Sequence, residues 1–178
     1  MNIKRMGGEY MNLKDNILKL NKKELKYIWS YTFDEGYNNE LILDPGCIYL
    51  EISDKLLKLC DVEGEGKIEI SLINGEDYIS DMDITYKIDI SNYIFDYPET
   101  NYYVEKIGVV DMVVKEDRNI CLAVQIEVNT ENYGKQTIFI HSGLFGLEFA
   151  RTNKRKNWIQ NYYIPLYGDN FEIKWIVK

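Results

Sequence analysis

The chain has 178 residues, of which 46% are hydrophobic and 28% are charged, and its formal net charge at pH 7 is −8. This composition is typical of globular proteins, and the length suits one domain that buries a core without help from disulfides or a structural metal. The negative charge argues against nucleic-acid binding, because domains with that function are usually basic. No apolar run approaches the ~20 residues of a membrane-spanning helix, so we expect no membrane segment.

Residues 1–10 are predicted to lie outside the folded domain, either as a disordered end or as a translated leader. They carry two positive charges but no apolar block, so they do not resemble a secretory signal. The segment Met6 to Met11 can be encoded by a purine-rich, ribosome-binding type of sequence, which leads to the hypothesis that Met11 is the natural start. The abundance of Asn, Lys, Ile and Tyr agrees with an AT-rich bacterial genome. We expect residues 11–178 to form a single α+β domain.

A helical pattern is confined to residues 12–30. Apolar residues at helical spacing predict a first helix over 12–20. A capping sequence that begins at Asn21 and has Glu24 at its third helical position predicts a second helix over 22–30. The chain is therefore expected to begin with a short helical hairpin or a bent helix.

From Cys47 onward, the apolar residues alternate with polar ones, as in strands that bury one face. The strongest signal is a hairpin formed by 104–115 and 119–128 around the polar loop Glu116-Asp117-Arg118. The first of its strands is apolar on both faces near its end, apart from Asp111. The other predicted strands are 47–52, 67–72, 84–90, 136–141 and 171–177, while 143–167 fits either another hairpin or a strand followed by a short helix.

These patterns predict an α+β fold, because nothing between the strands resembles the crossover helices of a parallel sheet. We expect about seven to nine strands in a largely antiparallel sheet, arranged as a sandwich or a partly closed barrel. The N-terminal helical segment is expected to pack on a face or an end of this sheet.

The cysteines are an odd number, Cys47, Cys60 and Cys121, and no two of them form a C-x-x-C pair. With His141 as the only histidine, a zinc site of the usual Cys/His type is excluded and no metal or other cofactor is predicted. The pattern favours reduced core cysteines in a cytoplasmic protein.

Acidic residues are concentrated in the middle of the chain. Residues 31–100 hold four Lys or Arg and seventeen Asp or Glu, whereas residues 1–30 hold seven and three and residues 101–178 hold ten and nine. Such a segment either keeps the protein soluble or attracts a basic partner. Tyrosine is abundant and suits both strands and protein interfaces. The candidate protein-binding residues are Glu63, Glu65, Glu76, Asp77, Asp81, Asp83, Tyr102 and Tyr103.

Other chemical signals are weaker. His141 and Ser142 are adjacent, and neighbouring side chains on a strand point to opposite faces, so they do not form a catalytic pair there. No catalytic residue is therefore assigned. The basic stretch 151–158 ends in Trp158, a combination that can bind nucleic acid, but four cations in an acidic chain favour a solvated turn instead.

Three functions remain compatible with the sequence. The favoured one is a non-enzymatic, acidic protein-binding module of the inhibitor or immunity type, which acts on a basic protein. The alternative is a β-sandwich or barrel that binds a small ligand in its interior. The third is an enzyme that uses carboxylates, for which the sequence singles out no residue set.

Overall fold

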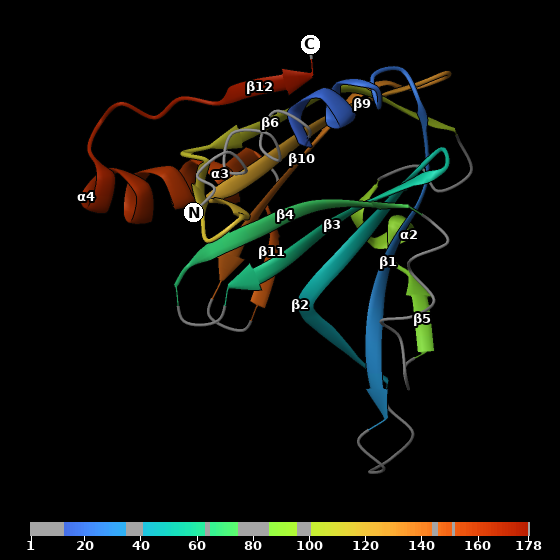
Figure 1. The fold of residues 1–178 in the computed structure, drawn as a ribbon, viewed down its shortest axis with the longest axis horizontal. Helices are drawn as coiled ribbons and strands as arrows, with labels where there is room; N and C mark the ends of the chain where they lie inside the picture. The colour runs from blue at the N-terminus through green and yellow to red at the C-terminus, as the bar shows by residue number, and fades with distance from the viewer. Residues whose placement is uncertain are drawn as a thin grey trace, which may run out of the picture.

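The computed structural model describes residues 13–34, 41–62, 65–74, 86–95, 101–143, 146–150 and 152–177. Their strands form one antiparallel sheet in the order β11-β10-β9-β6-β1-β2-β3-β4-β8-β7, with β12 paired to β6 and β5 paired to β1 (Figure 1). The described strands therefore number twelve, more than the seven to nine predicted. They are β1 (Glu24–Asp34), β2 (Leu41–Ile52), β3 (Lys55–Val62), β4 (Lys67–Asn74), β5 (Tyr86–Asp89), β6 (Tyr102–Val110), β7 (Val113–Lys115), β8 (Arg118–Cys121), β9 (Ala123–Thr130), β10 (Gly134–Gly143), β11 (Gly146–Ala150) and β12 (Lys174–Val177).

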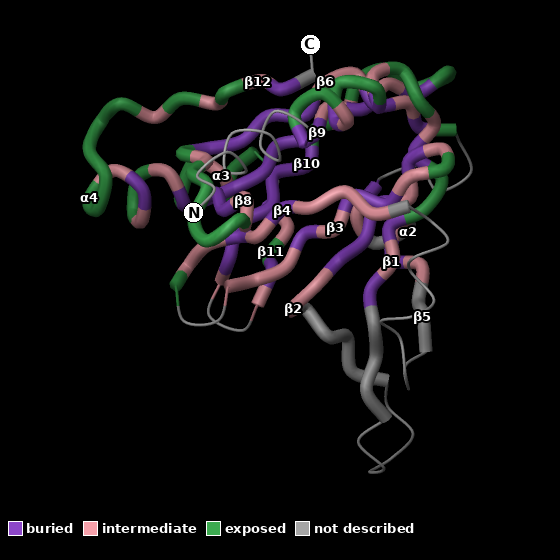
Figure 2. The backbone as a smooth tube through the Cα atoms, in the orientation of Figure 1, coloured by how far each residue is buried: buried purple, intermediate pink, exposed green. Residues whose placement is uncertain are grey.

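The sheet folds over on itself, so that β11 packs across from β2 and β3. The main core lies between the two halves, where alternate residues of β2, β3 and β4 meet alternate residues of β9 and β10. Figure 2 shows buried residues along these strands and exposed ones along α4. The sheet is largely antiparallel, as predicted, but it is not closed, so the partly closed barrel of the sequence prediction is wrong.

One long hairpin is shared between the two halves of the sheet. Its outer part, β7 and β8, pairs with β4, whereas its inner part, β6 and β9, pairs with β10 and β1. The two parts meet where Asp111 and Leu122 leave the strands, and the Leu122 amide donates a hydrogen bond of 2.9 Å to the Val110 carbonyl. This break turns the hairpin from one half toward the other.

The longest helical segment in the described part of the chain is C-terminal. It comprises α3 (Thr152–Trp158), the π-helical turn η2 (Ile159–Tyr163) and α4 (Ile164–Tyr167), and it confirms the second alternative for 143–167, a strand followed by a helix. Its buried residues Trp158 and Tyr163 pack on Phe139 and Leu122, on the outer face of the sheet. A four-residue helix, α2 (Ser91–Ile94), follows β5. Within the described ranges, no helix is both long and apolar enough to cross a membrane.

The predicted N-terminal helical region is mostly wrong. Only residues 13–18 are helical, and residues 22–30 lie in a turn and in β1 instead of a second helix. The physical reason is a bulge, because Leu25 pairs with Ile52 while Tyr27 pairs with Glu51, which leaves Lys26 as an extra residue. The bulge brings buried Leu25 and Ile28 to a spacing of three residues, which imitates a helix.

The β7–β8 turn places two non-glycine residues in the left-handed region. Lys115 pairs with Arg118, and the two residues between them, Glu116 and Asp117, have φ values of 53° and 65°. A two-residue hairpin turn of type I′ needs positive φ at both central positions, and Asn and Gly adopt such values most readily. The predicted hairpin is confirmed, but its loop is two residues rather than three, because Arg118 belongs to β8. Both residues of the loop strain the backbone.

Replacing Asp117 by Gly is expected to raise the free energy of unfolding by about 0.5 kcal/mol, because glycine removes the left-handed penalty but adds freedom to the unfolded chain. Urea titration measures the change. Asp54, an exposed turn residue whose φ is not positive, is the matched control, and Asp54→Gly should be destabilising. Equal effects of the two substitutions would contradict the assignment of strain to this turn.

The three cysteines do not behave alike. Cys47 and Cys60 are directly opposite each other on β2 and β3, with their Cα atoms 4.1 Å apart, and they form a disulfide. Cys121 is free and buried, as predicted. The prediction that all three are reduced is thus wrong, because the register of the β2–β3 hairpin, rather than a short sequence spacing, brings the pair together. The cysteines consequently no longer support the cytoplasmic location that we inferred from them.

Candidate functional site

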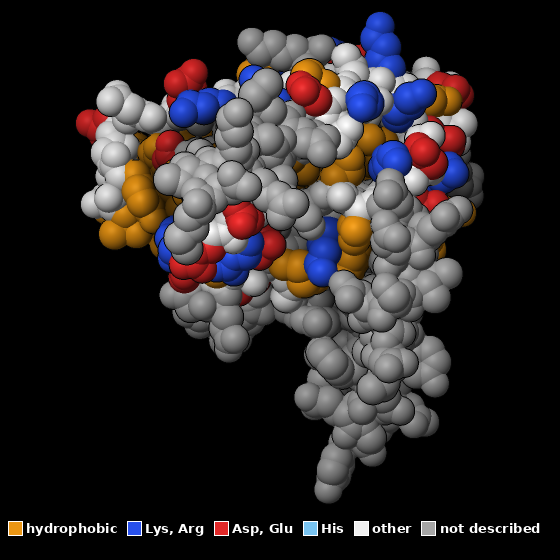
Figure 3. Space-filling view, in the orientation of Figure 1, with side chains coloured by type: hydrophobic (Ala, Val, Ile, Leu, Met, Phe, Trp, Pro, Cys, Tyr) orange, Lys and Arg blue, Asp and Glu red, His pale blue; other side chains and the backbone are white. Residues whose placement is uncertain are grey.

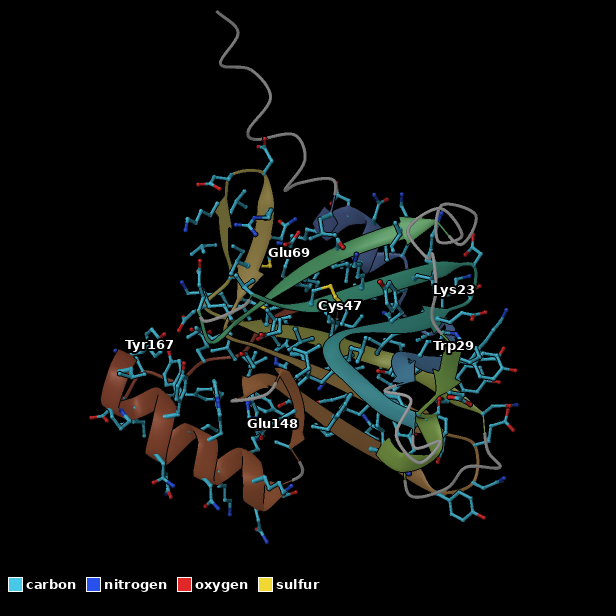
Figure 4. The ribbon with its side chains drawn as sticks, turned by 90° about the horizontal axis from the view of Figure 1, so that it is seen from below. Lys23, Trp29, Cys47, Glu69, Glu148 and Tyr167 are labelled. Atoms are coloured by element: carbon cyan, nitrogen blue, oxygen red, sulfur yellow. A yellow bond between two sulfur atoms is a disulfide. The ribbon has the colours of Figure 1, made fainter. Side chains whose placement is uncertain are left out.

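A cleft of about 300 Å³ lies between the β7–β8 hairpin and the C-terminal end of α4. In Figure 4 the yellow hairpin stands away from the sheet, on the same side of the molecule as the helix end at which Tyr167 is labelled. The floor of the cleft is apolar and includes the buried Cys121, while its rim carries one ammonium group, one carboxylate and one phenol. The lining residues are Lys67, Asp111, Val113, Ile120, Cys121, Leu122 and Tyr167.

Asp111 occupies a strained backbone position at the rim of this cleft. Its φ is 47°, in the left-handed region, and it lies at the break between β6 and β7. A non-glycine residue in this region costs on the order of 1 kcal/mol, and such strain clusters at functional sites. Tyr163 donates a hydrogen bond of 2.7 Å from its hydroxyl to Asp111 Oδ2, which holds the carboxylate in place at the rim.

The π-helical turn η2 positions the tyrosines beside the cleft. Its Tyr163 is buried and reaches Asp111, whereas its Tyr162 lies so close to Gly66 that a Cβ there would overlap the phenol oxygen. π-Helical turns insert an extra residue into a helix and recur at functional sites. Burial, together with the hydrogen bond to Asp111, raises the pKa of Tyr163 to about 12. Burial, with a smaller contribution from Tyr167, raises the pKa of Tyr162. Both phenols are therefore neutral hydrogen-bond donors near pH 7.

Exposed apolar side chains lie at the cleft and next to it, because Val113 and Tyr167 line it and Val114 and Leu166 are their neighbours in sequence. Val113 and Val114 of β7 are 55% and 44% exposed, and Leu166 and Tyr167 of α4 are 63% and 45% exposed. These four make up more than half of the large hydrophobic residues that are exposed in the described part of the chain. Figure 3 shows hydrophobic side chains at the end of the molecule where α4 lies, beside a group of charged ones. Exposed apolar side chains beside a cleft are typical of binding sites.

The cations near the cleft are matched by carboxylates. Glu65 lies 3.0 Å from the Lys67 ammonium and 3.9 Å from that of Lys115, and its hydrogen bond with Lys67 is the main reason why its pKa is lowered. Arg118 lies 3.6 Å from Glu69 and 4.0 Å from Glu116. Asp111, in contrast, accepts a hydrogen bond from the neutral Tyr163 hydroxyl. Among the described residues, no cation lies beside its carboxylate.

The edge of β7 is also unpaired. This strand is at the end of the strand order and pairs only with β8, so the outer side of Val113–Lys115 has no neighbouring strand in the described part of the protein. All three of its residues are exposed. An unpaired edge presents a row of backbone donors and acceptors to which another strand can be added.

The candidate binding residues predicted from the sequence do not come together in the described structure. Glu63, Glu76, Asp77, Asp81 and Asp83 lie outside the described residues. Glu65 is adjacent to the cleft through its ion pair with the lining residue Lys67. Tyr102 is buried and stacks on Phe95 at 3.9 Å between ring centroids. Tyr103 donates a hydrogen bond to Glu131 near the start of β6, at the opposite end of that strand from Asp111.

The contacts of His141, and of Arg155 and Trp158 in the basic stretch, are those of residues that hold the fold together. His141 is buried, its Nδ1 is 2.9 Å from the Ser142 carbonyl, and its ring stacks on Trp158 with the centroids 5.4 Å apart. Its Nε2 lies 3.9 Å from the exposed Glu148 carboxylate. Trp158 is 8% exposed, so it presents no face on which a nucleic-acid base could stack. Arg155 lies over the rings of Phe139 and Phe171, which places it in the contact between helix and sheet.

The sequence interpretation missed the residues that form the cleft. Asp111 did carry a signal, because it is the one charged residue in the apolar stretch that ends the predicted strand 104–115. Val113 carried none, since apolar residues in a strand are normally buried. Tyr167 carried a weak one, because tyrosine suits interfaces as well as strands and the core. Their exposure follows from the break in the hairpin and from the position of α4.

We found no protein-family model, no curated protein and no solved structure that matches this chain. The chemistry of the cleft is accordingly the basis on which a function can be assigned.

Proposed function

We propose that the protein is a binding module that takes up an extended segment of a basic partner protein in the cleft between β7 and α4. The observation that carries this proposal is that two exposed apolar side chains, Val113 and Tyr167, line one cleft beside an unpaired strand edge. The proposal keeps the predicted class of function, an acidic protein-binding module, and moves the contact surface from the acidic middle of the chain to the cleft.

Strand addition accounts for the backbone side of the proposed contact. A partner segment that runs along β7 pairs with the free backbone groups of Val113–Lys115, and alternate side chains of the segment then point into the cleft. Apolar partner side chains cover Ile120 and Leu122 on the floor and pack between Val113 and Tyr167 at the rim. Burying a large aliphatic side chain in such a pocket contributes about 1.5–3 kcal/mol.

Charge complementarity accounts for the preference for a basic partner. The Asp111 carboxylate is exposed, is oriented by Tyr163, and has no cation beside it among the described residues. A Lys or Arg of the partner completes this pair. The net charge of −8 also favours the approach of a basic protein, which raises the rate of association more than the final affinity.

In this proposal, the other ionisable groups of the cleft donate hydrogen bonds or take no part in binding, and none acts as a catalyst. Burial raises the pKa of the Cys121 thiol to about 12, so the thiol stays protonated and is a weak nucleophile. The pKa values of Tyr162 and Tyr163 are raised as well, which keeps both phenols neutral. The favoured chemistry is therefore binding.

A library of random linear peptides displayed on phage tests the proposal with a defined probe. Selection on the wild-type protein should enrich sequences in which apolar residues alternate with Lys or Arg. Tyr167→Ser should weaken the selected peptides at least about tenfold, because it removes a large side chain that lines the cleft. Asp111→Asn should weaken them by about fivefold, since an exposed ion pair contributes up to about 1 kcal/mol.

Tyr133 supplies the matched control, because it is 56% exposed in the β9–β10 turn and does not line the cleft. Tyr133→Ser should change the affinity of the selected peptides by less than about twofold, because its side chain lies outside the cleft. Circular dichroism confirms that each variant is folded. The proposal is wrong if no peptide is enriched, or if Tyr167→Ser and Tyr133→Ser have the same effect.

A further inference from the structure

A second cavity of about 370 Å³ opens where β11 leads into α3. Figure 4 labels Glu148 on β11, the strand that leads to this cavity. The cavity shares no lining residue with the cleft between β7 and α4, so binding here does not depend on the proposed function. The lining residues are Ile94, Thr137, Ile138, Phe149, Ala150, Thr152, Asn153 and Lys154.

The inner wall of this cavity is apolar and belongs to the core. Ile138 and Ala150 are buried, with exposures of 4% and 3%, while Ile94 and Phe149 pack against the main core cluster from its edge. The cavity thus leads from the surface to the margin of the space between the two halves of the sheet. A volume of this size, walled by aliphatic and aromatic groups, suits the apolar part of a small molecule.

The mouth of the cavity is polar and cationic. Thr137, Thr152, Asn153 and Lys154 are all exposed and contribute two hydroxyls, an amide and an ammonium group. None of the described lining residues carries a carboxylate. Lys154 forms no ion pair with a described carboxylate, in contrast to Lys67 and Lys115 at the other cleft. The groups at this mouth therefore favour an anion over a cation.

We propose that this cavity binds a small amphiphilic anion, a molecule with an apolar chain and a single anionic head group. The chain occupies the inner part, against Ile138 and Phe149, where it leaves water. The head group stays at the surface, where the Lys154 ammonium pairs with it and the Thr152 and Asn153 side chains donate hydrogen bonds. A medium-chain carboxylate is the simplest member of this class, and an alkyl phosphate or sulfate shares the chemistry that the site recognises.

The two cavities consequently have opposite charge preferences. The cleft between β7 and α4 presents the unpaired Asp111 carboxylate and favours a cation, whereas the second cavity presents the Lys154 ammonium and favours an anion. A peptide selected by the first site should not compete with an anion at the second site. Failure of one proposal therefore leaves the other standing, because the probes and the variants differ.

Titration with decanoate tests the proposal, with the methyl resonances of isoleucine and alanine recorded by NMR. Saturable shifts are expected at Ile94, Ile138 and Ala150, with little change at residues of the other cleft. Decyltrimethylammonium, which has the same chain and the opposite charge, should bind at least about tenfold more weakly, because the Lys154 ammonium repels it.

Two lysines on α3 supply matched variants, since Lys154 lines the cavity and Lys156 is exposed without lining it. Lys154→Glu should weaken decanoate at least about tenfold, while Lys156→Glu should weaken it less than about threefold. Thr137→Trp at the exposed mouth should block binding and leave the fold intact, as circular dichroism can show.

Three results would overturn the proposal. Decanoate that causes no saturable shifts shows that the cavity takes no amphiphile. Equal binding of decanoate and the ammonium compound shows that the head group is not recognised. Equal effects of Lys154→Glu and Lys156→Glu show that the general charge of α3, rather than the mouth of the cavity, attracts the anion.

Discussion

Replacement of Trp158 by Ala is expected to lower the free energy of unfolding by about 3–5 kcal/mol, the range for truncating a large buried aromatic side chain. The Trp158 ring is 5.3 Å from Phe139, 5.4 Å from His141 and 5.5 Å from Tyr162, measured between centroids, and joins the C-terminal helical segment to the outer face of β10. Loss of this contact should also weaken peptide binding in the cleft, because η2 and α4 position Tyr163 and Tyr167 there. Urea unfolding followed by circular dichroism measures the stability.

The control for this prediction is Trp158→Phe, which keeps an aromatic ring against Phe139 and His141. It should cost less than half as much as Trp158→Ala, because phenylalanine leaves a smaller cavity than alanine does. If the alanine variant lost less than about 0.5 kcal/mol, as for a surface position, the helical segment would not be held by this aromatic cluster.

Removal of the disulfide is expected to have the second-largest effect. In the loop-entropy description, a crosslink that closes about 15 residues stabilises a protein by about 3 kcal/mol, and Cys47 and Cys60 are separated by 13 positions. The double substitution Cys47→Ala and Cys60→Ala should therefore lower the free energy of unfolding by about that amount. Urea titrations of the wild type and the variant under non-reducing conditions measure the difference.

Reduction of the wild-type protein with dithiothreitol is the independent check. The reduced wild type should be about as stable as the double variant, and the double variant should not respond to the reductant. Cys121→Ala should leave the response to dithiothreitol intact, because Cys121 takes no part in the crosslink. Equal stability of the oxidised and reduced wild type would show that the two cysteines are not joined in the folded protein.

The strands were predictable wherever burial alternates strictly. In β9 the apolar residues Val124, Ile126 and Val128 alternate along the sequence and lie in the main cluster, although the start of the strand is buried on both faces. β3 was missed because Leu56 and Leu57 are adjacent apolar residues that face different clusters, which obscures the period of two. The second predicted helix failed for a related reason, since a single bulge at Lys26 changes the spacing of the buried residues in β1.

The candidate site was less accessible to prediction, because a cleft is formed by residues far apart in the chain. Asp111 was noticeable as a charge in an apolar strand, but its role depends on Tyr163, which reaches it across the fold. The apolar rim was not predictable either, since Val113 resembles any buried strand residue. The pairing of Cys47 with Cys60 likewise depends on a hairpin register that three separate cysteines do not reveal.

The shared hairpin also has a consequence for how the chain folds. The meander β1 to β4 and the meander β9 to β11 are each built from neighbours in sequence, so each can begin to form by itself. The contacts that unite them, Leu25 with Tyr102 and Ile68 with Cys121, join distant parts of the chain and require large loops to close. Domains dominated by such contacts fold on the order of milliseconds to seconds. The joining of the two meanders is therefore expected to limit the folding rate, and substitutions at Cys121 should slow folding more than substitutions within β10 and β11.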